Sequence, residues 1–472
     1  MYILVLESST TSAKAMYYNT DSGEYEVDAR PYSLDYVNDH TRFKPDKVFM
    51  QTVAVGRELV RGRDVDAVAL CSAWHSVGLF NERLEPVTPM YQWTSSYGSE
   101  FSAARRADEA YTNNYYETTG CMVNAIYPFF KLLKLAGAHD MTHIRAMGQG
   151  SYNNFRMTGE LAVTDCILSG SGLMDIRRLT YADGLLQELG IDKSHLPPLC
   201  TYKEEFTLSD EAAKLLGIKA GIPVIPTCAD GALNQTGSGA LHGEIMTFSV
   251  GTSGAIRLNS HTPRLSDGRK TWCYRTPSSW LSGAATNGAT NCIDWFKQLA
   301  FGNEVTYSDI EANIRELDNT PVFLPFVFGE RCPGWRDETR GGFRNLCPQH
   351  TLHDMYLAIE EGILFNLLQC YKELTRGAHE PAHIRLSGGI LNSKKWAQMC
   401  ADIFGRTLEI DGCKHASLMG GVVLAKERLG LIGRIEDHTL PPAGYVMPRL
   451  EKKAQYAQKF ERYMHFYEES TS

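Results

Sequence analysis

Residues 3–18 read Ile-Leu-Val-Leu-Glu-Ser-Ser-Thr-Thr-Ser-Ala-Lys-Ala-Met-Tyr-Tyr. The apolar run at residues 3–6 predicts a buried strand, and residues 15–18 predict a second strand. Residues 7–12 between them are polar and rich in Ser and Thr, which is typical of a tight turn. This stretch therefore predicts a β-hairpin at the beginning of the chain.

A similar unit recurs in the second half of the chain. Residues 245–250 are apolar, residues 251–254 read Gly-Thr-Ser-Gly, and residues 255–258 resume the strand as Ala-Ile-Arg-Leu. The repeat is short and weak, but its spacing predicts two lobes that each begin with a hairpin. We place the boundary near residue 240, which divides the chain into domains 1–240 and 241–472.

Further strands and helices alternate around these hairpins. Residues 66–71 and 76–80 predict two strands that pair, and residues 223–227 predict another. One apolar stripe at helical spacing predicts a long helix, formed by Met355, Ile359, Ile363, Leu367, Tyr371 and Leu374. Alternating strands and helices indicate an α/β protein whose sheets are covered by helices.

Composition excludes several classes of protein. The 472 residues are enough for two or three domains, and 47 Lys and Arg against 55 Asp and Glu give a net charge of −8. That balance favours neither nucleic acid nor an anionic membrane surface as a partner. No apolar run is long enough to span a bilayer, and the start of the chain lacks the pattern of a signal peptide. The 12 cysteines include no CxxC pair, so we expect reduced thiols and a cytoplasmic protein.

Common phosphate-binding and nucleophile motifs are absent from the sequence. There is no GxxxxGK[ST] loop and no GxSxG, and the GxG sets at positions 148, 170 and 237 all lack the third glycine of a dinucleotide fingerprint. The two hydroxyl-rich hairpin turns remain as candidates. One such turn alone most often only links strands, but two of them, one in each half, favour nucleotide binding. His350 and His353 lack supporting ligands, so we predict a loop and a helix start there and no structural metal.

Asp230 is the candidate acid beside these turns. Residues 226–240 read Pro-Thr-Cys-Ala-Asp-Gly-Ala-Leu-Asn-Gln-Thr-Gly-Ser-Gly-Ala, so Asp230 follows a strand and opens a glycine-rich helix. It fits a helix N-cap, although Leu233 stands where a capping box would have Glu or Gln. It also fits a general base, because a helix N-terminus favours the ionised carboxylate. The residues alone leave both alternatives open.

Five stretches together resemble the FGGY carbohydrate kinases of the actin-like ATPase superfamily, over residues 3–431. Residues 6–14 look like the family's first phosphate loop, and Ala229-Asp230-Gly231 with Gly237 and Gly239 is similar to its catalytic segment. The other three are residues 245–254 (second phosphate loop), 323–335 (a second-lobe stretch) and 385–402 (the adenosine motif). The resemblance implies an α/β fold of two actin-like, ribonuclease H-like domains with a catalytic cleft between them.

The resemblance also implies roles for individual residues. Asp230 would take the proton from the acceptor hydroxyl, with ATP and Mg²⁺ as cofactors. The implied phosphate-binding residues are Glu7, Ser9, Thr10, Thr11, Lys14, Gly251, Thr252 and Ser253. The implied adenosine-binding residues are Gly388, Gly389 and Asn392, and the implied sugar-binding residues are Trp74, His75 and Trp93 with Asp230. Mg²⁺ would be held with ATP, through water near Glu7, without a direct protein ligand. Lys14 and Lys131 each fit a structural role as well as a ligand contact.

Within the family, residues 72–76, 251–257 and 273–288 look most like the gluconate kinases. The implied reaction is ATP-dependent phosphorylation of D-gluconate to 6-phosphogluconate, and xylulose kinases are the nearest alternative. The expected partner is a small sugar or sugar acid, and a homodimer is compatible with the resemblance.

Two departures from the family pattern bear on activity. Glu7 stands where the family has Asp, and Trp93-Thr-Ser-Ser-Tyr97 lacks the acid and the arginine of the family's Trp-x-Asp-x-Arg segment. They motivate an alternative of another class, a catalytically lapsed regulatory protein that binds nucleotide or sugar. A third alternative is an actin-like polymer-forming or chaperone ATPase, which would not require an Asp at position 230.

Overall fold

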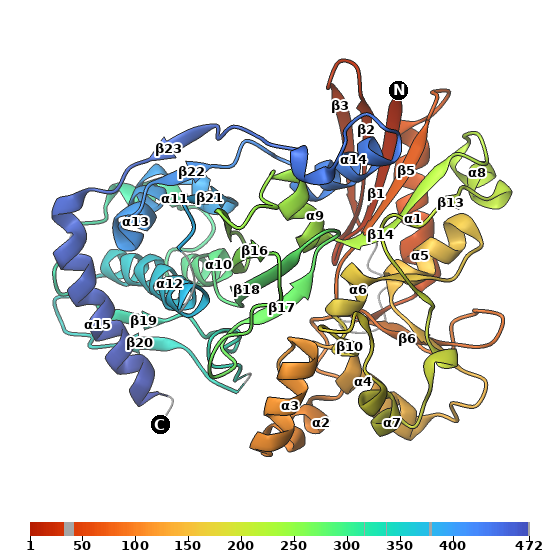
Figure 1. Ribbon diagram of the computed structural model, residues 1–472. Coiled ribbons are helices and arrows are strands. Elements are labelled where there is room, and N and C mark those ends of the chain that lie inside the picture. The colour runs from red at the N-terminus through yellow and green to blue at the C-terminus, as the bar shows by residue number, and fades with distance from the viewer. Residues whose placement is uncertain (33–41, 316, 337, 377–379, 471–472) are drawn as a thin grey trace.

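The computed structural model describes residues 1–472 except 33–41, 316, 337, 377–379 and 471–472. The described residues form two lobes, each built on one large sheet (Figure 1). Among the residues that the structure describes, the sheet of the first lobe has six strands in the order β13-β14-β5-β1-β2-β3. Their bounds are β1 (Tyr2–Ser8), β2 (Ser12–Asn19), β3 (Tyr25–Pro31), β5 (Ala67–Ser72), β13 (Phe206–Thr207) and β14 (Pro223–Ala229).

The sheet of the second lobe has seven strands within the described residues, in the order β17-β18-β16-β15-β21-β22-β23. Their bounds are β15 (Ile245–Val250), β16 (Gly254–Ser260), β17 (Trp272–Arg275), β18 (Trp280–Thr286), β21 (His383–Ser387), β22 (Leu408–Ile410) and β23 (Gly444–Val446). Strand β1 pairs antiparallel with β2 and parallel with β5, and β15 pairs antiparallel with β16 and parallel with β21. Both predicted hairpins are therefore present, and the first strand of each hairpin has the same two kinds of neighbour, one antiparallel and one parallel.

Helix α12 (Leu352–Thr375) forms the centre of the second lobe and contains the predicted apolar stripe. It begins at a capping box in which Thr351 and Asp354 satisfy each other's backbone N–H groups. Ile359, Ile363 and Leu367 are fully buried, so the helix is core on this face, as the sequence predicts. The other helices of this lobe are α10 (Thr290–Ala300), α11 (Tyr307–Ala312), α13 (Lys394–Phe404) and α15 (Lys453–Glu469).

Helix α14 (Ala416–Arg428) comes late in the chain but packs against the first lobe, beside α9 (Asp230–Gly237), β1 and β5 (Figure 1). Two glycines allow the close approach of α9 and α14. A Cβ on Gly420 would overlap the carbonyl oxygen of Leu233, and a Cβ on Gly237 would overlap that of Ala416. The boundary near residue 240 stays a prediction, with α14 as a segment that returns to the first lobe.

The predicted pairing of residues 66–71 with 76–80 is wrong. Strand β5 is already flanked by β1 and β14, so neither of its edges is open, and β6 (Gly78–Phe80) pairs with β8 (Arg145–Met147) instead. The remaining strands are short: β4 (Arg42–Phe43), β7 (Met90–Tyr91), β9 (Val163–Thr164), β10 (Met174–Asp175), β11 (Thr180–Tyr181), β12 (Leu199–Cys200), β19 (Val322–Leu324) and β20 (Gly342–Arg344).

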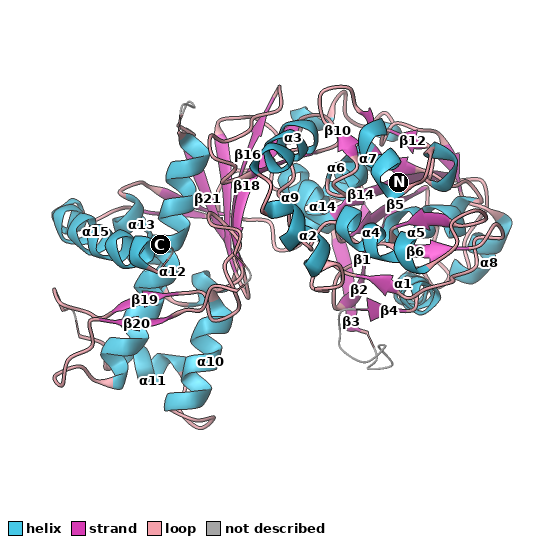
Figure 2. Cartoon of the chain, turned by 90° about the horizontal axis from the view of Figure 1, so that it is seen from below, coloured by secondary structure: helices cyan, strands magenta, loops and turns pink. Residues whose placement is uncertain are grey.

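Helices cover the sheet of the first lobe and build an extension below it. They are α1 (Pro45–Leu59), α2 (Ser99–Arg106), α3 (Glu109–Thr119), α4 (Pro128–Ala138), α5 (Gln149–Thr158), α6 (Asp165–Ser169), α7 (Asp183–Leu189) and α8 (Asp210–Leu216). Seen from below, the two sheets lie apart, and α9 lies where the lobes meet (Figure 2). All 12 cysteines are free thiols. Within the described ranges, no helix combines the length and apolar character needed to cross a bilayer.

Candidate active site

A cavity of about 520 Å³ lies between the lobes, a volume suited to a small ligand. Ten of the residues proposed from the sequence line it: Glu7, Ser9, Thr10, Thr11, Lys14, Trp74, His75, Trp93, Asp230 and Ser253. The first-lobe turn, the start of α9 and the second hairpin therefore converge on one space.

Asp230 is the first residue of α9, directly after buried strand β14. The N-cap is Ala229, and the Asp230 side chain accepts a hydrogen bond from the backbone N–H of Gly231 over 2.7 Å. Burial raises the pKa of Asp230 to about 6, and the negative charge of Glu7 raises it further. The hydrogen bond from Gly231 and the positive charges of Lys14 and Arg257 oppose this increase. A carboxyl group with this pKa is mostly ionised at neutral pH yet basic enough to accept a proton.

Glu7 lies at the end of β1 and is only 1% exposed. It faces Lys14 across the β1–β2 pair, and the Lys14 ammonium donates to Glu7 Oε1 over 2.8 Å. Ser9 also donates to Oε1, and Ser417 of α14 donates to Oε2 over 2.5 Å. Burial alone would raise the pKa of Glu7, but Lys14 and the two hydroxyls outweigh burial and lower it. Glu7 is therefore ionised, and hydrogen bonds hold both of its carboxylate oxygens in place.

Trp74 and His75 form one wall of the cavity. The indole N–H of Trp74 donates to the carbonyl of Cys166 over 2.9 Å. Glycines flank the ring, since a Cβ on Gly231 would lie 2.5 Å from Trp74 Cζ3 and one on Gly170 would lie 2.6 Å from Cδ1. His75 Nδ1 bonds the carbonyl of Gly170. Burial, with the nearby charge of Arg331, lowers the pKa of His75 to about 3, so the ring is neutral and its Nε2 is free to accept a hydrogen bond.

Trp93 connects the cavity wall to the first turn, because its indole N–H donates to Thr10 Oγ1 over 3.0 Å. The two residues that replace the family's acid and arginine do not line the cavity. Ser95 is buried and its hydroxyl accepts the backbone N–H of Tyr97, whose ring stacks on Tyr91 at 4.3 Å. Ser95 and Tyr97 thus serve packing rather than ligand contact.

The second hairpin turn is only partly in the cavity. Ser253 lines it, whereas Gly251 and Thr252 do not. Gly251 is held in the lobe, because its carbonyl accepts the N–H of Thr290 over 2.8 Å and its own N–H donates to the Ser253 carbonyl. Thr252 is exposed.

The three residues of the adenosine motif also lie outside this cavity. Gly388 adjoins the end of β15, with a φ of +96° and no space for a Cβ, which would lie 2.5 Å from the Val250 carbonyl oxygen. Gly389 follows it at the start of a short helical turn, and Asn392 ends that turn with an exposed side chain.

Several lining residues were missed by the sequence reasoning. They are Asn234, Ser249, Arg257, Trp272, Tyr274, Arg331 and Ser417, among others. For Arg257 a signal was available, since it is a charged residue between apolar neighbours in a strand that is otherwise mostly buried. Tyr274 and Arg331 lie in stretches that carry the family resemblance, and the others depend on how distant segments pack.

Lys131 and the two histidines are structural. Lys131 is fully buried and donates to the backbone carbonyls of Ala125 and Ile126, with no ion pair among the described residues. Burial lowers its pKa to about 7. His350 lies in the turn before α12, and His353 lies in its first turn. The part of the chain that the structure describes holds no cluster of three or more His, Cys, Asp or Glu suited to a metal.

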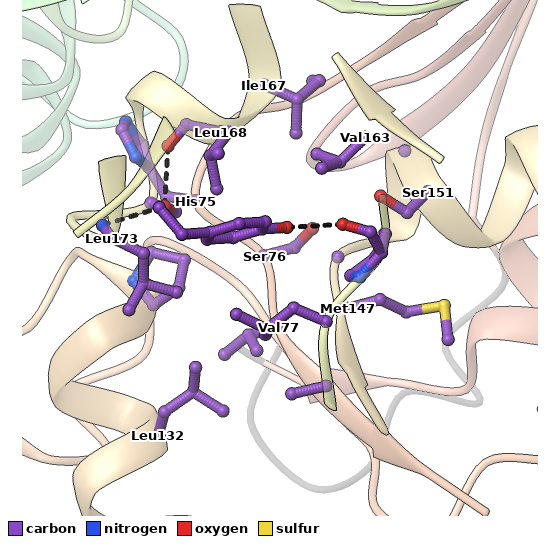
Figure 3. A pocket seen from close by; sticks show the side chains of 18 of the residues that line it. His75, Ser76, Val77, Leu132, Met147, Ser151, Val163, Ile167, Leu168 and Leu173 are labelled. Carbon is purple, nitrogen blue, oxygen red and sulfur yellow. Dashed lines mark hydrogen bonds between the residues drawn. The ribbon is translucent and has the colours of Figure 1, made fainter. Parts of the chain in front are cut away.

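A second, much smaller pocket of about 50 Å³ shares Ala73 and His75 with the main cavity (Figure 3). Its labelled walls are mostly apolar, with Val77, Leu132 and Leu168 among them. A space of this size holds at most a few water molecules. The cavity between the lobes, which contains Asp230 and the first turn, is therefore the candidate active site.

Comparisons with known proteins match both halves of the chain to one family. The model of the N-terminal domain of the FGGY family of carbohydrate kinases matches residues 2–237, and that of the C-terminal domain matches residues 246–426. The chain is 25% identical to the gluconokinase of Bacillus subtilis over 91% of this chain and 88% of that protein. It is 30% identical to a xylulose kinase of Staphylococcus epidermidis over 51% of this chain and 50% of that protein.

Solved structures show the same fold. The gluconate kinase of Lactobacillus acidophilus superposes with a TM-score of 0.92 at 25% identity, covering 98% of this chain and 97% of that one. A ligand-bound xylulose kinase of the same organism superposes with a TM-score of 0.94 at 24% identity, covering 100% and 98%. The expected two-domain, actin-like α/β fold is thereby confirmed.

Proposed function

The chain belongs to the FGGY family of carbohydrate kinases, and from this premise we propose that it transfers the γ-phosphoryl group of ATP to D-gluconate, giving 6-phosphogluconate. The observation that carries the proposal is Asp230, a carboxylate with a pKa of about 6 that faces a cavity lined by the hydroxyl-rich first turn. This is the group a sugar kinase needs, because the acceptor hydroxyl must lose its proton as it attacks phosphorus.

In the proposed reaction, Asp230 accepts the proton of the sugar hydroxyl. The hydroxyl oxygen forms a bond to the γ-phosphorus while the bond from that phosphorus to the ADP oxygen breaks. Trp74 and neutral His75 would hold the sugar, with His75 Nε2 as an acceptor for a hydroxyl. Trp93 would complete that wall through its hydrogen bond to Thr10.

The nucleotide would lie across the two turns. In the first lobe, the hydroxyls of Ser9, Thr10 and Thr11 and the ammonium of Lys14 are the proposed phosphate donors. In the second lobe, the proposed donors are Gly251, Thr252 and Ser253, and the proposed adenosine contacts are Gly388, Gly389 and Asn392. Closure of the lobes would bring the exposed Thr252 toward the phosphates and exclude water, which competes as an acceptor.

The residues present fit a magnesium ion that is held through water. Glu7 Oε1 already accepts two hydrogen bonds and Oε2 accepts one, so a carboxylate with about four acceptor positions keeps one for a metal-bound water. When bound with ATP, Mg²⁺ would neutralise charge on the phosphate oxygens. Glu7 would orient that water from its fixed position.

One comparison supports D-gluconate over a ketose. Over nine tenths or more of this chain, the gluconokinase of Bacillus subtilis is 25% identical, whereas the xylulose kinases that align over a similar share are 22% identical. Xylulose kinase activity is the second candidate, because the xylulose kinase of Lactobacillus acidophilus shares the whole fold.

The test measures ADP release by purified protein with ATP and Mg²⁺ across D-gluconate, D-xylulose, L-ribulose and glycerol. We expect turnover on D-gluconate and a drop in kcat of about 10²–10⁴-fold in Asp230→Asn. Asp210→Asn is the matched control, because Asp210 is also the first residue of a helix but lies outside the cavity. Full activity in Asp230→Asn would rule out the assigned base, and turnover on D-xylulose alone would replace the assigned substrate.

A further inference from the structure

Two arginines of the second lobe line the cavity without an ion-pair partner among the described residues. Arg257 projects from β16, and Arg331 follows β19 at the start of the loop 331–336. Neither side chain forms an ion pair with the residues that the structure describes, and the Nε–H of each is buried without a hydrogen-bond partner. Arg257 has one long hydrogen bond, from Nη1 to Ser249 Oγ at 3.4 Å. Arg331 lies 5.9 Å from the ring centroid of Trp335.

An unpaired charge that is partly withdrawn from water is unfavourable, and here two charges of the same sign act on each other. Burial lowers the pKa of Arg257 to about 10, the charge of Asp230 opposes that shift, and the charge of Arg331 adds to it. A protein keeps such groups when a ligand supplies the missing anion. Two guanidinium groups present planar donor pairs that match a carboxylate or a phosphate.

Strand register and ring contacts indicate which end of the cavity these arginines serve. Arg257 and Trp272 lie in one row across β16, β18 and β17. Trp272 stacks on Tyr274 at 4.2 Å, and the ring of Tyr274 lies 5.1 Å from that of Trp74. Arg331 lines the same cavity, and its charge acts on Tyr274. Both arginines therefore adjoin the wall that Trp74 forms.

We propose that Arg257 and Arg331 form a carboxylate-binding subsite at the sugar end of the cavity, which selects aldonic acids over the matching neutral polyols. The inference rests on the proposed function and deepens it, since it assigns residues to the charged end of the substrate. With its carboxylate at this subsite, an extended aldonic acid directs its other end toward Asp230. A neutral polyol leaves both guanidinium groups without an anionic partner at this subsite.

The loop that carries Arg331 is held from several sides, as a preformed subsite requires. Glu330 is fully buried and accepts hydrogen bonds from Tyr467 of α15 over 2.6 Å and from the N–H of Gly334 over 2.9 Å. Arg106 of the first lobe donates to the Trp335 carbonyl over 2.8 Å. Arg331 is thus presented by a fixed loop.

The experiment compares Arg331→Gln and Arg257→Gln with Arg177→Gln, whose side chain is exposed and paired with Glu117 outside the cavity. Steady-state kinetics use matched pairs that differ in charge, D-gluconate with D-glucitol and D-xylonate with xylitol. We expect Arg331→Gln to raise KM for the aldonate by at least about 30-fold, the cost of leaving one partner of a buried charge pair unmatched. KM for ATP should change little, and Arg177→Gln should match the wild type.

Each other outcome is decisive. A raised KM for ATP with an unchanged KM for the aldonate would assign the pair to phosphate and overturn the proposal, as would preference of the wild type for the neutral polyols or for D-xylulose. Turnover on D-xylonate but not D-gluconate would sustain the subsite while rejecting the proposed substrate.

If no compound is phosphorylated, calorimetry with D-gluconate and a non-hydrolysable ATP analogue decides the question. Loss of D-gluconate binding in Arg331→Gln supports the subsite, and no D-gluconate binding to the wild type overturns it. Arg331→Lys keeps the charge without the planar donor pair, so its KM for the aldonate should lie between those of the wild type and Arg331→Gln. This variant also keeps the test valid if Arg331→Gln fails to fold.

Discussion

Ser417 donates a hydrogen bond to Oε2 of Glu7 over 2.5 Å, although the two residues lie 410 positions apart in the chain. Lys14 holds the other oxygen from the neighbouring strand. A helix near the end of the sequence therefore helps to fix the anion at its beginning. That anion in turn raises the pKa of Asp230, so the return of α14 to the first lobe contributes to the chemistry of the site.

The first prediction concerns the pH dependence of the reaction. Because Asp230 must be ionised, kcat/KM for the sugar should fall about tenfold per pH unit below about 6. Glu7→Gln removes a negative charge that raises the pKa of Asp230. The fall of kcat/KM at acid pH, its acid limb, should therefore begin at lower pH in this variant, whatever happens to the maximal rate. Ser417→Ala keeps the charge of Glu7 and should leave the limb in place. An acid limb at the same pH in Glu7→Gln would show that the two carboxylates are not coupled.

The second prediction is that Asp230→Asn stabilises the protein at high pH. The pKa of about 6 lies above the ordinary value of 3.8, so the folded state keeps a proton that the unfolded chain releases between about pH 4 and 6. The free energy of unfolding therefore falls as pH rises through that window, by about 1–3 kcal/mol. Thermal melting should show a gain for Asp230→Asn at pH 8 and almost none at pH 4. An equal change at both pH values would indicate an effect unrelated to ionisation.

The third prediction concerns the fit of Trp74 against α9. In Gly231→Ala the new Cβ would lie 2.5 Å from Trp74 Cζ3, and the indole is held by its bond to the Cys166 carbonyl. Overpacking of this kind costs about 1–3 kcal/mol, so KM for the sugar should rise about tenfold or more while KM for ATP stays near the wild-type value. Gly184→Ala is the control, because nothing lies within 4 Å of its added Cβ. A wild-type KM for the sugar in Gly231→Ala would remove Trp74 from the sugar wall.

The fourth prediction addresses the contact between α15 and the loop that carries Arg331. Tyr467→Phe removes the hydroxyl that donates to buried Glu330, which should lower the free energy of unfolding by about 1–3 kcal/mol. Urea titration measures this change. The control is Tyr445→Phe, because Tyr445 is 62% exposed. If Tyr467 positions the loop, KM for D-gluconate rises more than KM for ATP, whereas a stability effect alone leaves both constants unchanged.

Much of the fold was accessible from local pattern. The apolar runs at residues 3–6 and 245–250 predicted the two hairpins, and the stripe from Met355 to Leu374 predicted α12, because strands and helices repeat at fixed short periods. Asp230 could be assigned to a helix start after a strand for the same reason. The pairing of residues 66–71 with 76–80 failed because it assumed that neighbouring strands pair, whereas β5 is enclosed by β1 and β14.

The sequence by itself determined the two hairpins, the family and the candidate base. Each of them can be recognised from short contiguous stretches of residues. Only the tertiary structure decided that Ser417 reaches Glu7, that Asp230 is not its helix's N-cap, and that Arg257 and Arg331 line the same cavity. The physical reason is that hydrogen-bonding periods act over a few residues of chain. Burial, charge proximity and the pKa values that follow from them depend on surfaces contributed by segments hundreds of residues apart.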